Sequence, residues 1–181
     1  MAILLKGEGL ELILSMYDPL PFREVYEIGQ KQELRGNPGI AFKVYQYALD
    51  RFQQGRIDPA FPAYQPVFFD RWMASSMAAS VGKFMVQKQD LDQAAAFLSK
   101  AFEFTKDPLT RAPLFDNPEA RYWTAELYFQ RGDLRSARAF FEDLADYSVD
   151  VELARGARAR ITDIERLVAE ARTAHPLKRV A

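Results

Sequence analysis

Small residues recur at fixed distances in three stretches of this 181-residue chain. In each stretch a glycine or alanine is followed by an alanine 12 positions later and by a large apolar residue 16 positions later. Two helices cross closely only where small side chains meet, and a large side chain one turn further on fills the gap beside them. The pattern therefore predicts three helical hairpins. Its members are Gly29, Gly36, Ala41, Tyr45 and Ala48, then Gly82, Gln89, Ala94, Leu98 and Ala101, then Ala125, Gly132, Ala137, Phe141 and Leu144.

Helix signals dominate the chain and strand signals are scarce. Three pairs of capping residue and proline suit helix starts, because the cap accepts an orphan N–H and proline has none to lose. These pairs are Asp18-Pro19, Asn37-Pro38 and Asn117-Pro118, and the further expected N-caps are Asp90 and Asp133. The predicted helices span 20–34, 38–54, 67–88, 91–106, 118–131, 134–147 and 151–174, and residues 10–17 are a further candidate.

Length and composition predict a single all-α domain over residues 1–181. Hydrophobic residues make up 49% of the chain, enough for a core without disulfides or metals. Two proline-rich connections, 55–66 and 107–117, cannot be helical and are expected to be ordered surface loops. An alternative for the first loop is that Phe61 and Tyr64 cover a groove or an apolar edge. The expected order is an N-terminal extension over 1–17, hairpins over 20–54, 67–106 and 118–147, and a capping helix over 151–174.

The hairpins resemble tetratricopeptide repeats over about residues 20–150. The best match is ARYWTAELYFQRGDLRSARAFFEDL, with Ala125, Tyr128, Gly132, Asp133, Ala137 and Phe141 in place. The chain departs from the family at Val25, Ala78 and Arg121, where tryptophan is common, and its units are spaced more widely. The resemblance implies a short right-handed solenoid of antiparallel hairpins, closed by the C-terminal helix, that binds a protein or peptide segment along its concave groove.

Carried over position by position, the resemblance also implies which residues line that groove. They are Arg23, Tyr26, Gln30, Ser76, Lys83, Glu119, Tyr122, Glu126 and Arg160. Family members that grip the C-terminal carboxylate of chaperones use lysine, asparagine and arginine at fixed groove positions. Those positions here hold Tyr26, Gln30, Ser80, Glu119 and Trp123, so chaperone binding of that kind is not expected. Self-association is a further option, because the aromatic content could leave an exposed apolar patch.

Composition argues against catalysis. The chain has no cysteine and a single histidine, His175, which excludes thiol chemistry and makes zinc or Ser-His chemistry improbable. No glycine-rich phosphate loop is present. The sequence therefore predicts a non-catalytic protein without metal or cofactor. It also predicts a cytoplasmic location and no membrane span, because Lys6 interrupts the N-terminal apolar run and no run reaches about 18 residues.

The alternative function is binding of RNA or another anionic ligand through the C-terminal helix. That helix carries Arg155, Arg158, Arg160, Arg166 and Arg172, but it also carries Glu152, Asp163, Glu165 and Glu170. The interleaving indicates pairing within the helix rather than a track for phosphates. The net charge of −1 gives no global attraction for nucleic acid. Binding to nucleic acid is therefore not expected.

Overall fold

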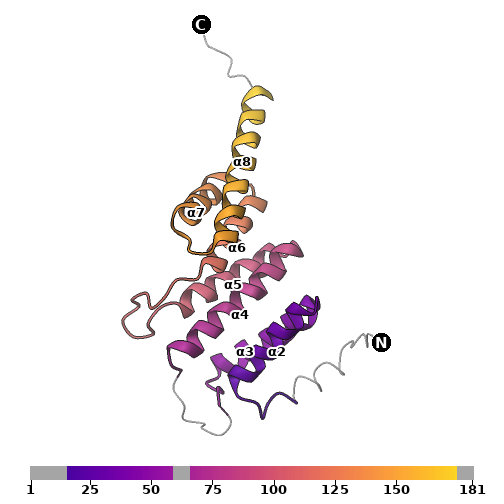
Figure 1. Ribbon diagram of the computed structural model, residues 1–181, viewed down its shortest axis with the longest axis vertical. Helices are drawn as coiled ribbons and strands as arrows, with labels where there is room; N and C mark the ends of the chain where they lie inside the picture. The colour runs from indigo at the N-terminus through magenta and orange to yellow at the C-terminus, as the bar shows by residue number, and fades with distance from the viewer. Residues whose placement is uncertain (1–15, 59–65, 175–181) are drawn as a thin grey trace. The chain divides into compact units, whose positions relative to one another are not determined.

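The computed structural model describes residues 16–58 and 66–174. The helices are α2 (Phe22–Leu34), α3 (Pro38–Gln53), α4 (Phe68–Gln87), α5 (Leu91–Phe104), α6 (Pro118–Gln130), α7 (Leu134–Tyr147) and α8 (Val151–Ala174) (Figure 1). The described part of the chain contains no strand, so the all-α prediction is confirmed. The predicted helix boundaries agree with the observed ones to within two residues. The candidate helix at 10–17 falls mostly outside the described residues, and Phe61 and Tyr64 lie wholly outside them.

The chain forms two compact units, Met1–Asn117 and Pro118–Ala181. In the first unit, α2 pairs with α3, α4 pairs with α5, and α3 packs on α4. In the second unit, α6 pairs with α7, and α7 packs on α8. Within each unit the first hairpin therefore packs on the next helix along the chain, as in a helical-repeat solenoid. The prediction of a single domain stays a prediction. No helix within 16–58 and 66–174 is long and apolar enough to cross a membrane.

The predicted small residues lie where helices touch. A Cβ atom added to Gly29 would stand 2.1 Å from Cε1 of Tyr45, and one added to Gly82 would stand 2.6 Å from Cγ of Leu98. Both distances are below any real contact, so each glycine lets a large side chain of the paired helix approach its backbone. In the second unit Ala125, with Ala137 and Phe141, forms part of one fully buried cluster. The hairpin pattern is therefore confirmed.

The predicted caps divide into two groups. Asp90 accepts a hydrogen bond from the backbone N–H of Gln93 at 3.2 Å, and Asp133 accepts one from that of Ser136 at 3.1 Å, so both are N-caps. Asn37 occupies the N-cap position of α3 but makes no capping hydrogen bond. Its side-chain amide donates instead to the side-chain oxygen of Gln32 at 3.2 Å.

Asp18 was wrongly expected to begin a helix. Helix α2 begins at Phe22, and Asp18 instead accepts a short hydrogen bond from the Tyr47 hydroxyl of α3. Arg51, also on α3 and 2% exposed, donates to the carbonyls of Tyr17 at 2.8 Å and Leu20 at 2.9 Å. A buried guanidinium needs such partners, so the segment before α2 completes the first hairpin.

Replacing Asp18 with asparagine should lower the pKa of Tyr47. Burial, followed by the hydrogen bond with Asp18, raises the pKa of Tyr47 from 10.0 to about 12. The raised value means that the contact stabilises the fold below about pH 10 and that this contribution is lost as the pH rises through about 12. An alkaline absorbance titration, with Tyr47→Phe as the reference, should therefore show one tyrosine ionising earlier in the Asp18→Asn variant. An unchanged titration would contradict the assignment.

Candidate binding surface

In the first unit, α2 and α4 are the first helices of their hairpins, and they carry part of the predicted groove. Tyr26 of α2 is 8% exposed, and its hydroxyl accepts a hydrogen bond from the Gln30 side chain at 2.8 Å. Its ring meets the ring of Trp72 of α4 edge-on, with centroids 6.1 Å apart. Tyr26 therefore joins the two helices, while exposed Gln30 and half-buried Ser76 lie at the surface.

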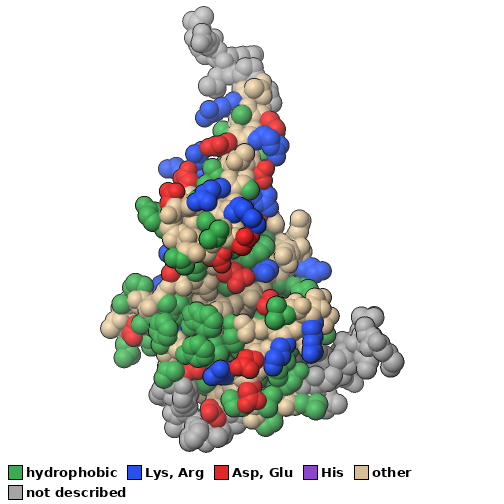
Figure 2. Space-filling view, in the orientation of Figure 1, with side chains coloured by type: hydrophobic (Ala, Val, Ile, Leu, Met, Phe, Trp, Pro, Cys, Tyr) green, Lys and Arg blue, Asp and Glu red, His purple; other side chains and the backbone are tan. Residues whose placement is uncertain are grey.

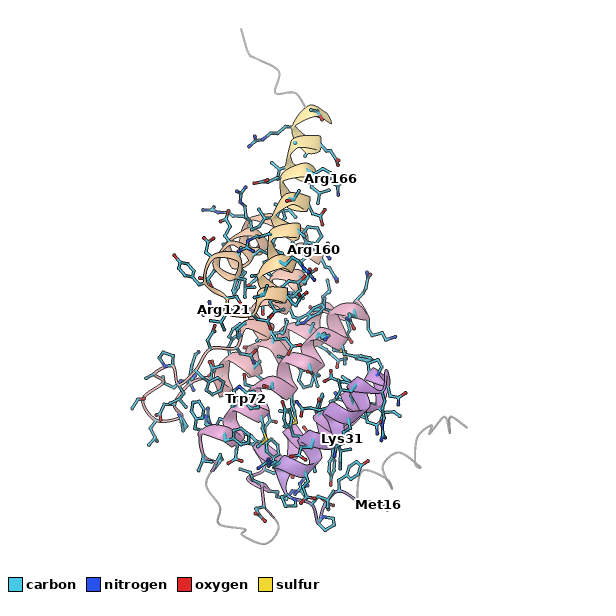
Figure 3. The ribbon with its side chains drawn as sticks, in the orientation of Figure 1. Met16, Lys31, Trp72, Arg121, Arg160 and Arg166 are labelled. Atoms are coloured by element: carbon cyan, nitrogen blue, oxygen red, sulfur yellow. The ribbon has the colours of Figure 1, made fainter. Side chains whose placement is uncertain are left out.

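Exposed aromatic side chains continue this surface at the beginning of α4, where hydrophobic side chains gather in Figure 2. Phe68, Phe69 and Trp72 are 53%, 48% and 37% exposed. Phe69 stacks on Trp72, which is labelled in Figure 3, with centroids 5.6 Å apart. The guanidinium of Arg23 stands 5.9 Å from the centroid of Phe69. Arg23 also pairs with Glu27 at 3.1 Å. The first-helix surface is the name used below for Arg23, Gln30, Phe69, Trp72 and Ser76.

The resemblance to the repeat family did not reveal Phe69 and Trp72. The groove positions carried over to α4 begin at Ser76, eight residues after the helix begins at Phe68. The signal was present in the sequence, since Phe69 and Trp72 precede Ser76 by seven and four positions. Residues at those spacings share one face of a helix. Extending the face toward the N-terminus would have identified both aromatics.

The second unit brings Tyr122, Glu126 and Arg160 into one polar cluster. Glu126 of α6 is 3% exposed, and both its carboxylate oxygens accept hydrogen bonds from Arg160 of α8, at 2.6 and 3.1 Å. Arg160 also donates to Asp163 at 3.2 Å, and its guanidinium stands 5.0 Å from the ring centroid of Phe129. These partners occupy much of the donor capacity of the guanidinium. The cluster therefore fastens α8 to α6.

Tyr122 completes this cluster. Burial, followed by the negative charge of Glu126, raises the pKa of its hydroxyl above the ordinary value. Its ring lies against Gly156 of α8, where an added Cβ atom would stand 3.1 Å from the ring and the hydroxyl. Glu119, the remaining predicted residue of α6, is half-buried in the first helical turn. A carboxylate is favoured there by the helix dipole.

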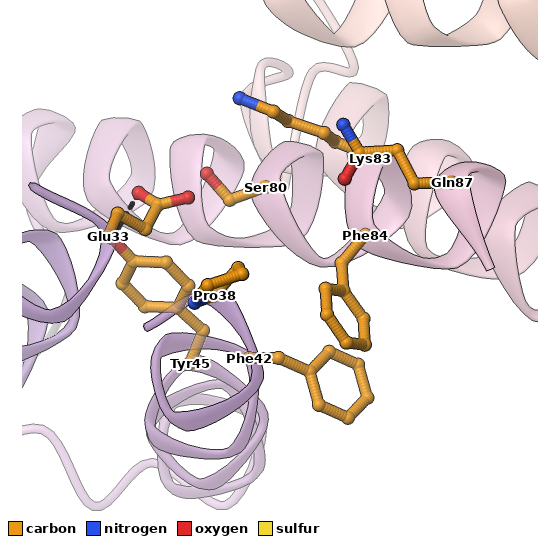
Figure 4. Close-up of a pocket in the computed structure, with 8 residues that line it drawn as sticks. All are labelled: Glu33, Pro38, Phe42, Tyr45, Ser80, Lys83, Phe84 and Gln87. Carbon is orange, nitrogen blue, oxygen red and sulfur yellow. Dashed lines mark hydrogen bonds between the residues drawn. The ribbon is translucent and has the colours of Figure 1, made fainter. Parts of the chain in front are cut away.

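A pocket lies between the end of α2, the beginning of α3 and the last turns of α4 (Figure 4). It contains about 250 Å³ of empty space that opens to solvent. The predicted residue Lys83 lines it, so it adjoins the same side of α4 as the first-helix surface. Its lining residues are Glu33, Pro38, Phe42, Tyr45, Ser80, Lys83, Phe84 and Gln87.

Three of the five arginines of α8, namely Arg155, Arg160 and Arg166, are paired with acidic residues. Arg155 pairs with Glu152, and Arg166 pairs with Glu170 at 3.2 Å and with Asp163 at 3.6 Å. Arg160 and Arg166 follow one another along α8 (Figure 3). Paired cations attract phosphates less, so this helix does not present a continuous cationic track.

The described residues offer little for catalysis by a metal ion. No group of three or more histidine, aspartate or glutamate side chains in the described ranges could hold a metal ion.

Ser75 is fully buried, where its hydroxyl donates to the Ala101 carbonyl at 2.9 Å and accepts from the Asn117 amide at 2.8 Å. This serine therefore holds the loop before α6 in place. His175 lies outside the described residues.

Together, the paired helices and the surface on their first members define an all-α helical-repeat protein. A family model for the tetratricopeptide repeat matches residues 85–161, from the end of α4 into α8. This part of the chain is therefore similar to tetratricopeptide repeats, as its sequence resemblance indicated. Such repeats typically act as protein-interaction scaffolds and are typically non-catalytic. Comparisons with curated proteins and with solved structures give no match.

Proposed function

We propose that this chain is a non-catalytic interaction module that binds a peptide or protein segment on its first-helix surface. The observation that supports this most is the exposed pair of stacked rings, Phe69 and Trp72, beside predicted groove residues on a tetratricopeptide-like hairpin stack. Large aromatic side chains provide much contact area at low entropic cost and are enriched among the residues that carry binding energy. Contiguous exposed apolar patches commonly mark interaction sites.

The first unit is favoured over the second because its exposed rings, Phe69 and Trp72, can be covered without breaking an ion pair. In the second unit Glu126 and Arg160 bind one another, and Tyr122 is half-buried beside them. A ligand that used these side chains would have to replace existing hydrogen bonds, which leaves little net gain. At the first-helix surface a ligand could cover exposed rings directly.

Replacing Phe69 and Trp72 together with serine should reduce capture of partner proteins from the source-cell lysate by about tenfold or more, the loss expected for two hot-spot aromatics. The control is Leu109→Ser, which removes another apolar side chain that is 91% exposed. Quantitative mass spectrometry measures recovery, and circular dichroism verifies that both variants fold. Equal recovery by the wild type and the double variant would place the binding site elsewhere. Sedimentation of the purified chain tests whether the same rings join two copies.

A further inference from the structure

We infer that the pocket beside Lys83 accepts an apolar side chain from an acidic partner segment. This inference rests on the proposed function, and it specifies the chemistry of the partner. The occupant is an extended peptide segment in which an apolar residue is flanked by aspartate or glutamate. Two features of the pocket support it, the aromatic wall and the surrounding charge.

The wall of the pocket suits an apolar side chain. Phe42 of α3 and Phe84 of α4 stack with ring centroids 4.7 Å apart, and Tyr45 lies one turn beyond Phe42. Phe42 is 7% exposed, so the stacked pair is already held by the fold rather than free to collapse. The hollow faces solvent, and its empty space of about 250 Å³ includes open solvent, so an entering side chain would lie in a shallow depression (Figure 4). Phe84 is half-buried, so covering it would remove part of its aromatic surface from water.

The three helix segments that form the pocket carry an excess of positive charge. Residues 30–35, 38–45 and 80–88 contain five cations and one carboxylate, that of Glu33. The cations are Lys31, Arg35, Lys43, Lys83 and Lys88. Glu33 accepts a hydrogen bond from the Tyr45 hydroxyl at 2.9 Å. Acidic residues of a partner are therefore attracted to this region, and basic residues are repelled.

Two of the other lysines do not line the pocket but lie over the two rings that form its wall. The ammonium of Lys43 lies 5.3 Å from the ring centroid of Phe42, and that of Lys88 lies 5.6 Å from the centroid of Phe84. A carboxylate next to an apolar residue that enters the pocket would meet these ammonium groups. The nearest acidic residue that follows α4, Asp90, is engaged as the N-cap of α5.

The pocket and the first-helix surface can be covered by one ligand. Trp72 and Lys83 are eleven residues apart on α4, and Ser76 and Ser80 lie between them at helical spacing. At 1.5 Å per residue the separation along the axis is about 16 Å, a length that about five residues of extended chain span. A short segment that contacts Trp72 would therefore reach the pocket.

Three labelled peptides test the inference by fluorescence anisotropy on the full chain. The first is Asp-Glu-Glu-Phe-Glu-Asp-Glu, the second has glycine in place of phenylalanine, and the third has lysine at every acidic position. We expect the first to bind most tightly, the second several-fold more weakly and the third not at all. Binding of the first peptide should weaken as the salt concentration rises, because dissolved ions screen the attraction between its carboxylates and the lysines. Equal binding by the first and third peptides, or no binding by the first, would overturn the inference.

Two lysine variants locate the site. Lys43→Gln with Lys88→Gln should weaken the first peptide roughly three- to tenfold, the effect of two partly screened charges. Lys100→Gln is the matched control, because its ammonium also lies over a ring, 5.1 Å from the Phe97 centroid on α5, but Phe97 does not line the pocket. Equal losses in both variants would overturn the site. If lysate capture still depends on Phe69 and Trp72 while the peptide fails, the proposed function stands and the pocket inference alone is wrong.

Discussion

Replacing Gly29 with valine should lower the free energy of unfolding by about 3 kcal/mol, the upper end of the usual cost of overpacking. Even a single Cβ atom at this position would stand 2.1 Å from the Tyr45 ring. Tyr45 cannot easily move away, because it is 1% exposed and its hydroxyl donates to Glu33 at 2.9 Å. Urea denaturation measures the loss, and hydrogen exchange should localise it to α2 and α3.

Gly39→Ala is the control for this substitution. Gly39 lies in the first turn of α3, and a Cβ atom added there would meet nothing within 4 Å. Alanine is the better helix former, so this change should leave stability equal to the wild type or raise it by up to about 1 kcal/mol. If Gly29→Val were as stable as Gly39→Ala, the close approach of α2 and α3 would be wrong.

Replacing Arg160 with methionine should destabilise the second unit by about 2–3 kcal/mol. The substitution keeps an apolar stem but leaves the Glu126 carboxylate, which is 4% exposed, buried without its bidentate partner. Breaking a fully buried ion pair costs about 3–5 kcal/mol, and the value here is smaller because Arg160 is 36% exposed and partly screened. Denaturation followed by hydrogen exchange in α6 and α8 measures the loss.

Arg166→Met is the control, because Arg166 is 60% exposed in its pairs with Asp163 and Glu170, and such pairs contribute little. Equal losses at Arg160 and Arg166 would contradict a buried role for Glu126.

The fold could be predicted largely from local patterns. Glycine and alanine spacing identified the crossings at Gly29 and Gly82, and Asp90 and Asp133 were recognised as caps because capping involves neighbouring residues only. Asp18 was misjudged because its partner, Tyr47, is 29 residues away. A side chain that could cap a helix can instead bind a side chain far away in the sequence. The residues next to it do not reveal that distant partner.

The binding surface could be predicted only in part. Arg23, Tyr26 and Gln30 were placed on the correct helix, but the position of each side chain depended on its neighbours. The Tyr26 side chain is buried because the Trp72 ring packs against it. The stacked rings of Phe42 and Phe84 come from helices that are separated by a loop, so no local spacing indicated the pocket.

Within residues 16–58 and 66–174, the sequence by itself determined the helices, their boundaries and the points at which paired helices touch, because these depend on residues within one hairpin. The tertiary structure decided which candidate binding side chains pair with other residues of the protein and which remain exposed. Arg160 and Glu126 became partners, whereas Phe69 and Trp72 stayed exposed. The physical reason is that exposure and pairing depend on what a neighbouring helix places opposite each side chain, and that arrangement exists only after the helices have packed.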